Sequence, residues 1–155
     1  MTPLFKKLNL KAGSGAVVVL DAPPSFEPEL AALDGVPILR APVPGLAFAL
    51  AFVSTQAGLD TAAAMLTAQA GDDALLWFAY PKQSSKRYRC EFHRDRGWDA
   101  LGAAGWETVR MVAIDADWSA LRFRQLAHVG RLQRDPARAL SPAGKARARP
   151  RPGPP

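Results

Sequence analysis

A continuous apolar run, Ala74–Tyr80, most constrains how this chain can fold. An apolar run of this length without a charge is typical of a β-strand that is buried on both faces. Pro81 follows directly and predicts the end of the strand, because proline has no backbone N–H to donate to a neighbouring strand. Strands buried on both faces occur in sheets that are covered by helices on each side. The run therefore favours a fold of the α/β class.

Five further segments have the patterns of strands. The apolar runs Ala16–Leu20 and Leu46–Val53 are predicted to be buried strands, and Val36–Leu39 a short one. Apolar and polar residues alternate in Thr108–Ile114 and Ser119–Leu126, which are joined by a short acidic turn. This alternation predicts an antiparallel hairpin at one edge of the sheet.

Three helices are expected between the strands. They cover Phe26–Leu33, a segment that runs to about Ala70, and Arg96–Ala104. Small polar residues precede each helix and are the expected N-caps: Ser25, Ser54 or Thr55, and Asp95. Glycine is the residue that most often ends a helix, and Gly71 and Gly105 are the expected ends of the second and third.

The order of these elements predicts a small Rossmann-like α/β domain in three layers over residues 1–130. Its sheet is expected to be mostly parallel, with about five or six strands, and to be closed by the C-terminal antiparallel hairpin. One link conflicts with this arrangement, because the segment between Leu39 and Leu46 is too short for a helical crossover. Either Val36–Leu39 is not a full member of the sheet or it pairs antiparallel, so the strand order there stays open.

The net charge of +6 belongs to the C-terminal tail. Residues 131–155 contain seven basic residues and one acidic residue, whereas residues 1–130 contain 13 of each. The tail is rich in Pro, Ala and Arg and has no apolar periodicity, which predicts disorder. Only this tail favours a nucleic-acid partner, through non-specific, salt-dependent contacts with polyanions.

Cysteine content and apolar runs indicate the compartment. Cys90 is the only cysteine, so an internal disulfide is excluded and a reducing compartment is favoured. The N-terminus lacks the long apolar core of a secretory signal, and no apolar run has membrane-spanning length. These features predict a cytoplasmic protein without a membrane partner, and they leave the oligomeric state open.

Few residues have the spacing of a known catalytic or cofactor site. A dinucleotide or S-adenosylmethionine site needs a glycine-rich turn after the first strand, but Asp21–Ser25 contains two prolines and no glycine. Cys90, His93 and Asp95 would suit a nucleophile–base pair or a metal site. A buried cysteine, a loop histidine and a helix cap explain them more simply, because zinc needs about four ligands and only His128 remains. We therefore predict no catalytic residue, no metal site and no cofactor.

The tryptophans and the paired aspartates also have structural explanations. Trp77, Trp98, Trp106 and Trp118 are spread over separate elements, which favours packing over a stacking platform. Asp115 and Asp117 resemble a pair of catalytic carboxylates, but a hairpin turn explains them more simply. Neither set therefore adds a predicted active site.

Several longer motifs resemble a family of small bacterial proteins of unknown activity. They are DAPPSFEPEL, LLWFAYPK, the Ser-Lys-Arg-Tyr loop, RDRGWDALG and VAIDADWSALRFR, all within Leu4–Leu126. The resemblance implies a Rossmann-like domain similar in outline to a trimmed methyltransferase core with its terminal antiparallel hairpin. It implies no activity. The family pattern has Asn at the position of His93, which argues against a catalytic role for this residue.

The carboxyl ends of the strands are the best candidate site, because ligands of open α/β sheets gather there. Hydroxyls, cations and two expected helix N-termini meet at this edge and favour an anion, nearest Lys82, Ser84 and Ser85. The full set of predicted ligand-binding residues is Asp21, Ser25, Ser54, Thr55, Gln56, Tyr80, Lys82, Ser84, Ser85, Lys86 and Arg87.

Two functional hypotheses follow from this edge. The first is a non-catalytic domain whose anion-accepting crevice binds a small anionic ligand or a protein partner. The second is a degenerate methyltransferase-like enzyme. The missing glycine-rich turn favours the first hypothesis, and catalysis stays an open question.

Overall fold

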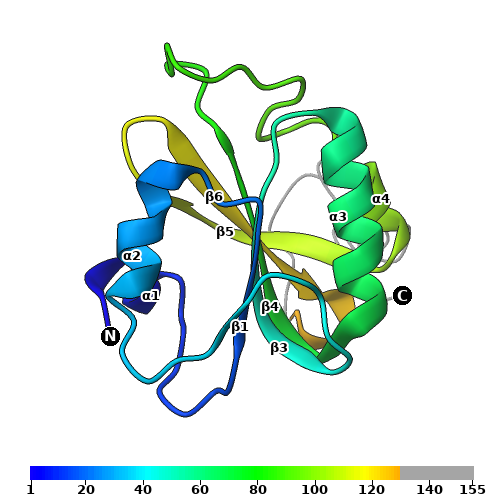
Figure 1. Ribbon diagram of the computed structural model, residues 1–155. Helices are drawn as coiled ribbons and strands as arrows, with labels where there is room; N and C mark the ends of the chain where they lie inside the picture. The colour runs from blue at the N-terminus through cyan, green and yellow to red at the C-terminus, as the bar shows by residue number, and fades with distance from the viewer. Residues whose placement is uncertain (130–155) are drawn as a thin grey trace, which may run out of the picture.

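The computed structural model describes residues 1–129 and contains one six-stranded sheet of order β2-β1-β3-β4-β6-β5 (Figure 1). β1, β2, β3 and β4 are parallel, whereas β6 runs antiparallel to β4 and to β5. The predicted fold class is therefore confirmed, and the predicted disordered tail, residues 131–155, lies outside the described residues. The strands are β1 (Val17–Leu20), β2 (Ile38–Leu39), β3 (Leu46–Phe52), β4 (Ala70–Pro81), β5 (Trp106–Ala113) and β6 (Trp118–Gln125).

Helices cover both faces of the sheet (Figure 1). One face carries α1 (Pro3–Lys7) and α2 (Glu27–Ala31), and the other carries α3 (Gln56–Gln69) and α4 (Asp99–Ala103). Among residues 1–129 no helix is long and apolar enough to cross a membrane.

Each face has its own hydrophobic core. Leu59 and Leu66 of α3 pack with Phe78 on one face, and Phe5 and Phe26 pack with Phe48 on the other. The interior position of β4 explains its apolar run, because this strand contributes side chains to both cores. The tryptophans are all at most 5% exposed, which confirms that they pack inside the protein: Trp77, Trp98, Trp106 and Trp118.

The short link before β3 is resolved by the position of β2. β2 is only two residues long and pairs parallel with the start of β1, so the antiparallel alternative is wrong. Val18 pairs with Leu39 on one side and with Ala49 on the other, so the end of β2 is level with the middle of β3. The chain must return by only about 10 Å along the strands and cross one strand, which residues 40–45 can span.

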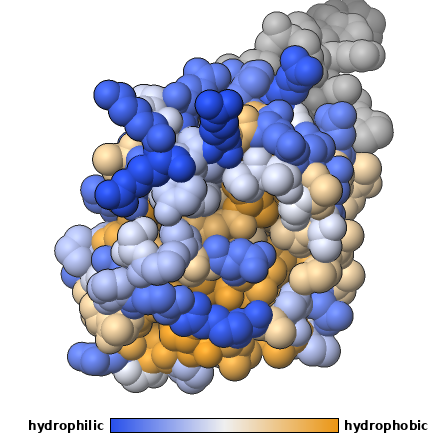
Figure 2. Space-filling view, turned by 45° about the horizontal axis from the view of Figure 1, so that its top comes forward, coloured by the Kyte–Doolittle hydropathy of each residue, from blue (hydrophilic) through white to orange (hydrophobic). Residues whose placement is uncertain are grey.

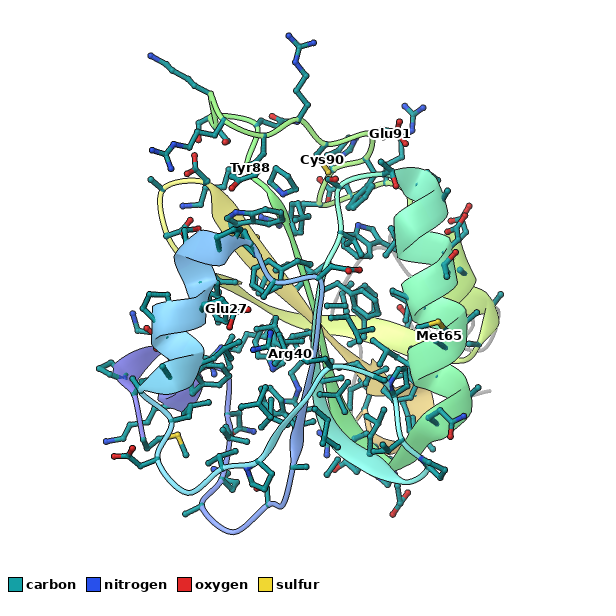
Figure 3. All side chains as sticks on the ribbon, viewed as in Figure 1. Glu27, Arg40, Met65, Tyr88, Cys90 and Glu91 are labelled. Carbon is teal, nitrogen blue, oxygen red and sulfur yellow. The ribbon has the colours of Figure 1, made fainter. Side chains whose placement is uncertain are left out.

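A bidentate ion pair fixes the end of β2. Both terminal nitrogens of Arg40 donate to the Glu27 carboxylate at 2.8 Å, and Figure 3 shows the pair between α2 and the sheet. This contact ties the two-residue edge strand to the first turn of α2. Two ladder pairs alone give a strand little stability of its own.

The predicted helix ends are right in two cases and wrong in three. Thr55 Oγ1 accepts a hydrogen bond from Gly58 N at 3.0 Å and caps α3, and Gly105 follows α4 with φ +87°. Ser25 is not a cap, because a 3₁₀ turn (Pro24–Phe26) leads directly into α2. Asp95 does not cap α4, which begins only at Asp99. Gly71 does not end α3, because β4 begins at the preceding residue.

Candidate functional site

The strand order reverses between β1 and β3. β1 connects through α2 to β2 on one side, whereas β3 lies on the other side and connects through α3 to β4. In open α/β sheets the crevice beyond such a reversal is the usual ligand site. A cavity of about 440 Å³ lies here, and we call it the switch-point cavity. Its lining includes Asp21, Pro23, Phe52, Ser54, Thr55, Tyr88 and Trp118.

Aromatic rings form one side of the switch-point cavity. The Trp118 ring lies 5.1 Å from that of Phe52 and 4.9 Å from that of Tyr88, measured between ring centroids. Trp118 is 5% exposed, and its buried Nε1 has no hydrogen-bond partner within the described residues. Asp21 supplies a carboxylate on an exposed residue. A planar group would find apolar contacts here.

A long loop, residues 82–98, follows β4 and rises above the carboxyl edge of the sheet (Figure 1). Its second half is held to the start of α3: Glu91 N donates to Ser54 O at 2.9 Å, and Gln56 N donates to Glu91 Oε1 at 2.8 Å. Gln56 Nε2 also donates to Gly97 O at 2.8 Å. Gly97 has φ +108°, and a Cβ there would lie 2.6 Å from Phe92 Cβ, so the loop needs glycine at this position.

This loop encloses a second, larger cavity, which we call the basic cavity. It has a volume of about 780 Å³ and is lined by three cations, Lys82, Arg89 and Arg96. Within residues 1–129 none of the three forms an ion pair. Tyr88 lines both the basic cavity and the switch-point cavity, so the two adjoin. Figure 2 shows hydrophilic side chains gathered at the top of this face, above a hollowed hydrophobic area.

A third cavity of about 460 Å³ lies on the β4–β6 side of the same loop. Tyr80 and Ser119 come from the two strands, and Lys82, Ser84 and His93 come from the loop. Lys82 and His93 also line the basic cavity. We call this space the hydroxyl cavity.

Most of the predicted ligand-binding residues line one of these three cavities. Asp21, Ser54 and Thr55 line the switch-point cavity, Gln56 and Ser85 the basic cavity, and Tyr80 and Ser84 the hydroxyl cavity, while Lys82 lines the last two. Ser25, Lys86 and Arg87 are exposed and line none of the three.

Some of the predicted anion donors are already engaged within the chain. Ser85 Oγ donates to Asp117 Oδ1 at 2.8 Å and accepts from Tyr88 N at 3.2 Å, so this hydroxyl shapes the loop. The first N–H groups of α3 donate to Glu91 and to Thr55. The α3 N-terminus therefore holds a carboxylate of the chain itself, and Figure 3 shows Glu91 beside the end of this helix.

Sequence reasoning missed four residues that line these cavities. Arg89 and Arg96 line the basic cavity, but Arg96 was assigned to a helix that in fact begins at Asp99. Trp118 and Ser119 begin β6 and reach the site only through strand pairing. Their signal is the register of the hairpin, which follows from its acidic turn. There Asp115 Oδ1 accepts from Asp117 N and Trp118 N at 2.8 and 2.9 Å, which confirms the turn interpretation of these aspartates.

Cys90, His93 and Asp95 do not form a catalytic constellation. His93 Nδ1 accepts a hydrogen bond from Asp95 N at 3.2 Å, a contact within the loop. Cys90 packs against the core beneath α3 and α4. Within residues 1–129 no group of three or more His, Cys, Asp or Glu side chains is placed to hold a metal ion.

Cys90 is expected to react slowly with alkylating reagents. Burial raises the pKa of its thiol, and the thiolate is the reactive form. At pH 8 we expect iodoacetamide to modify the native protein roughly tenfold more slowly than the protein in urea. Mass spectrometry of the intact chain measures both rates. Equal rates would show that the thiol is exposed and ionises normally.

Comparison with known proteins finds only distant similarity. No family model matches the chain, and no curated protein matches it. Two solved structures are similar: the enzyme LepI in complex with SAH and a substrate analogue (15% identity, TM-score 0.43), and a pericyclic reaction enzyme (14% identity, TM-score 0.41). In each case the alignment covers 79% of this chain and 39% of the solved chain, so this chain spans about two fifths of their length.

Proposed function

We propose that this chain is a non-catalytic ligand-binding domain that accepts a small anionic molecule in the crevice at the carboxyl edge of its sheet. One observation carries the proposal: Lys82, Arg89 and Arg96 line one cavity and have no ion-pair partner within the described residues. Cations held around a concave, partly enclosed space attract anions more strongly than scattered surface charges.

The adjoining switch-point cavity indicates what else the ligand carries. Its rings and its carboxylate suit a planar group that bears hydrogen-bond donors, whereas the basic cavity suits an anionic group. Because Tyr88 lines both spaces, one molecule with a planar part and an anionic part can occupy both. A mononucleotide has this chemistry and is a suitable probe.

A titration of the full chain with adenosine monophosphate, followed by backbone amide NMR, tests the proposal. We expect shifts at residues 54–56 and 82–97, and a loss of affinity of about tenfold in Lys82→Ala, as for one hydrogen bond to a charged group. Lys86→Ala is the matched control, because Lys86 lies in the same loop but lines none of the three cavities. Absence of shifts at millimolar ligand, or equal effects of both variants, would reject the proposal.

The alternative, a degenerate methyltransferase-like enzyme, is tested by a parallel titration with S-adenosylhomocysteine. Pro23 and Pro24 line the cavity where a glycine-rich turn would let the ligand approach the backbone. We therefore expect no saturable binding of S-adenosylhomocysteine. Micromolar binding of this ligand would favour the enzyme hypothesis.

A further inference from the structure

We infer that the hydroxyl cavity is an oxyanion site in which the side chains of Tyr80 and Ser119 bind a phosphate or carboxylate group. This inference rests on the proposed function and assigns the anionic group of the ligand to particular donors. The two residues face each other across the β4–β6 ladder, so their side chains leave the sheet on the same face about 5 Å apart at Cβ.

Both hydroxyls are buried and poorly satisfied. Ser119 is 7% exposed, and its hydroxyl makes no hydrogen bond within residues 1–129. Tyr80 is 6% exposed, and its hydroxyl donates only to Met111 Sδ at 3.6 Å. A thioether sulfur is a weak acceptor, so the phenol loses little by turning to an oxyanion. Buried hydroxyls without a strong partner are costly, and a ligand that accepts from them removes that cost.

The remaining polar lining is also rich in donors. Burial raises the pKa of the Tyr80 phenol, so this group stays protonated at neutral pH. His93 Nδ1 accepts from Asp95 N, which places the proton of the neutral ring on Nε2. Lys82 and Arg94 add positive charge, and Asp95 is the one carboxylate of the lining, 3.9 Å from the Arg94 guanidinium. A donor set of this kind favours an oxyanion over a cation or an apolar group.

The site lies apart from the reversal of strand order. It is formed by β4, β6 and the loop, on the face that carries α3 and α4, and shares no lining residue with the switch-point cavity. It communicates with the basic cavity through Lys82, Gln83, Phe92 and His93, which line both. An anionic group extending from the basic cavity can therefore enter it.

The test is a titration of the full-length protein with inorganic phosphate and, separately, with acetate, followed by amide NMR at constant ionic strength. In the unmodified protein we expect the amides of residues 80, 93 and 119 to shift with phosphate. Tyr80→Phe and Ser119→Ala should each weaken phosphate binding about tenfold, because each removes one hydrogen bond to a charged group. Ser14→Ala, in an exposed turn before β1, is the hydroxyl control and should bind phosphate normally.

The outcomes separate this inference from the proposed function. If phosphate shifts residues 82–97 equally in the unmodified protein and both variants, the proposed function stands and the hydroxyl site is rejected. If the unmodified protein shows no saturable shift, both are rejected. Shifts with acetate at the same amides would indicate a carboxylate ligand, and shifts with phosphate alone a phosphate ligand. Ser119→Ala removes a single atom, so it decides the matter if Tyr80→Phe fails to fold.

Discussion

Trp98→Ala is expected to lower the free energy of unfolding by about 4 kcal/mol, the cost of deleting a buried tryptophan side chain. Trp98 is 1% exposed and contacts the rings of Phe78, Phe92 and Phe123. It also holds the loop, since Trp98 Nε1 donates to His93 O at 2.9 Å. Urea denaturation followed by far-UV circular dichroism measures the loss.

Trp98→Phe separates packing from the hydrogen bond. Phenylalanine keeps most of the ring contacts but leaves His93 O without this donor, so we expect a loss of about 1–2 kcal/mol, together with faster amide exchange in residues 91–97. A loss of less than about 1 kcal/mol in Trp98→Ala would show that the aromatic cluster below the loop contributes little to stability.

The strands and their faces could be predicted because their patterns are local. Ala74–Tyr80 is buried on both faces in the structure because β4 lies inside the sheet between the two cores. The alternation in residues 106–125 likewise predicts the antiparallel edge. The place of β2 was not predictable, because two ladder pairs and the Arg40–Glu27 ion pair hold it, and both depend on tertiary contacts.

Helix starts failed where the backbone before the helix was misjudged. Ser25 has a good capping side chain, but Pro23 and Pro24 initiate a 3₁₀ turn that includes it. Asp95 lies in a tight turn in which His93 and Arg96 pair through their backbones, so the chain is not yet helical there. Sequence patterns identify capping residues better than they identify these competing turns.

The site was predicted in location but not in composition. The carboxyl edge follows from the α/β topology alone, which is why Asp21, Thr55 and Lys82 were found. Ser119 and Arg96 come to the site through strand register and loop path, which no local pattern encodes. The reverse error is Lys86, a cation in the right loop that points to no cavity described here.

Glu91→Gln is expected to tighten binding of an anionic ligand about fivefold or more. Glu91 lines the basic cavity together with Lys82, Arg89 and Arg96, so its negative charge opposes an incoming anion. Glutamine keeps an oxygen that can accept from Gln56 N, and the anchor of the loop on α3 is thereby preserved. Removing one unit charge at about 4 Å in water changes an equilibrium constant about fivefold, and more where solvent is partly excluded.

Asp34→Asn is the matched control, because it removes the same charge from an exposed turn after α2 and outside the three cavities. Calorimetric titration with adenosine monophosphate at two ionic strengths measures both variants. We expect the gain in Glu91→Gln to shrink with added salt, because the repulsion that it removes is screened. Equal affinities in Glu91→Gln, Asp34→Asn and the unmodified protein would place the anion outside the basic cavity. Weaker binding in Glu91→Gln would show that the carboxylate contributes to the site through the order that it imposes on the loop.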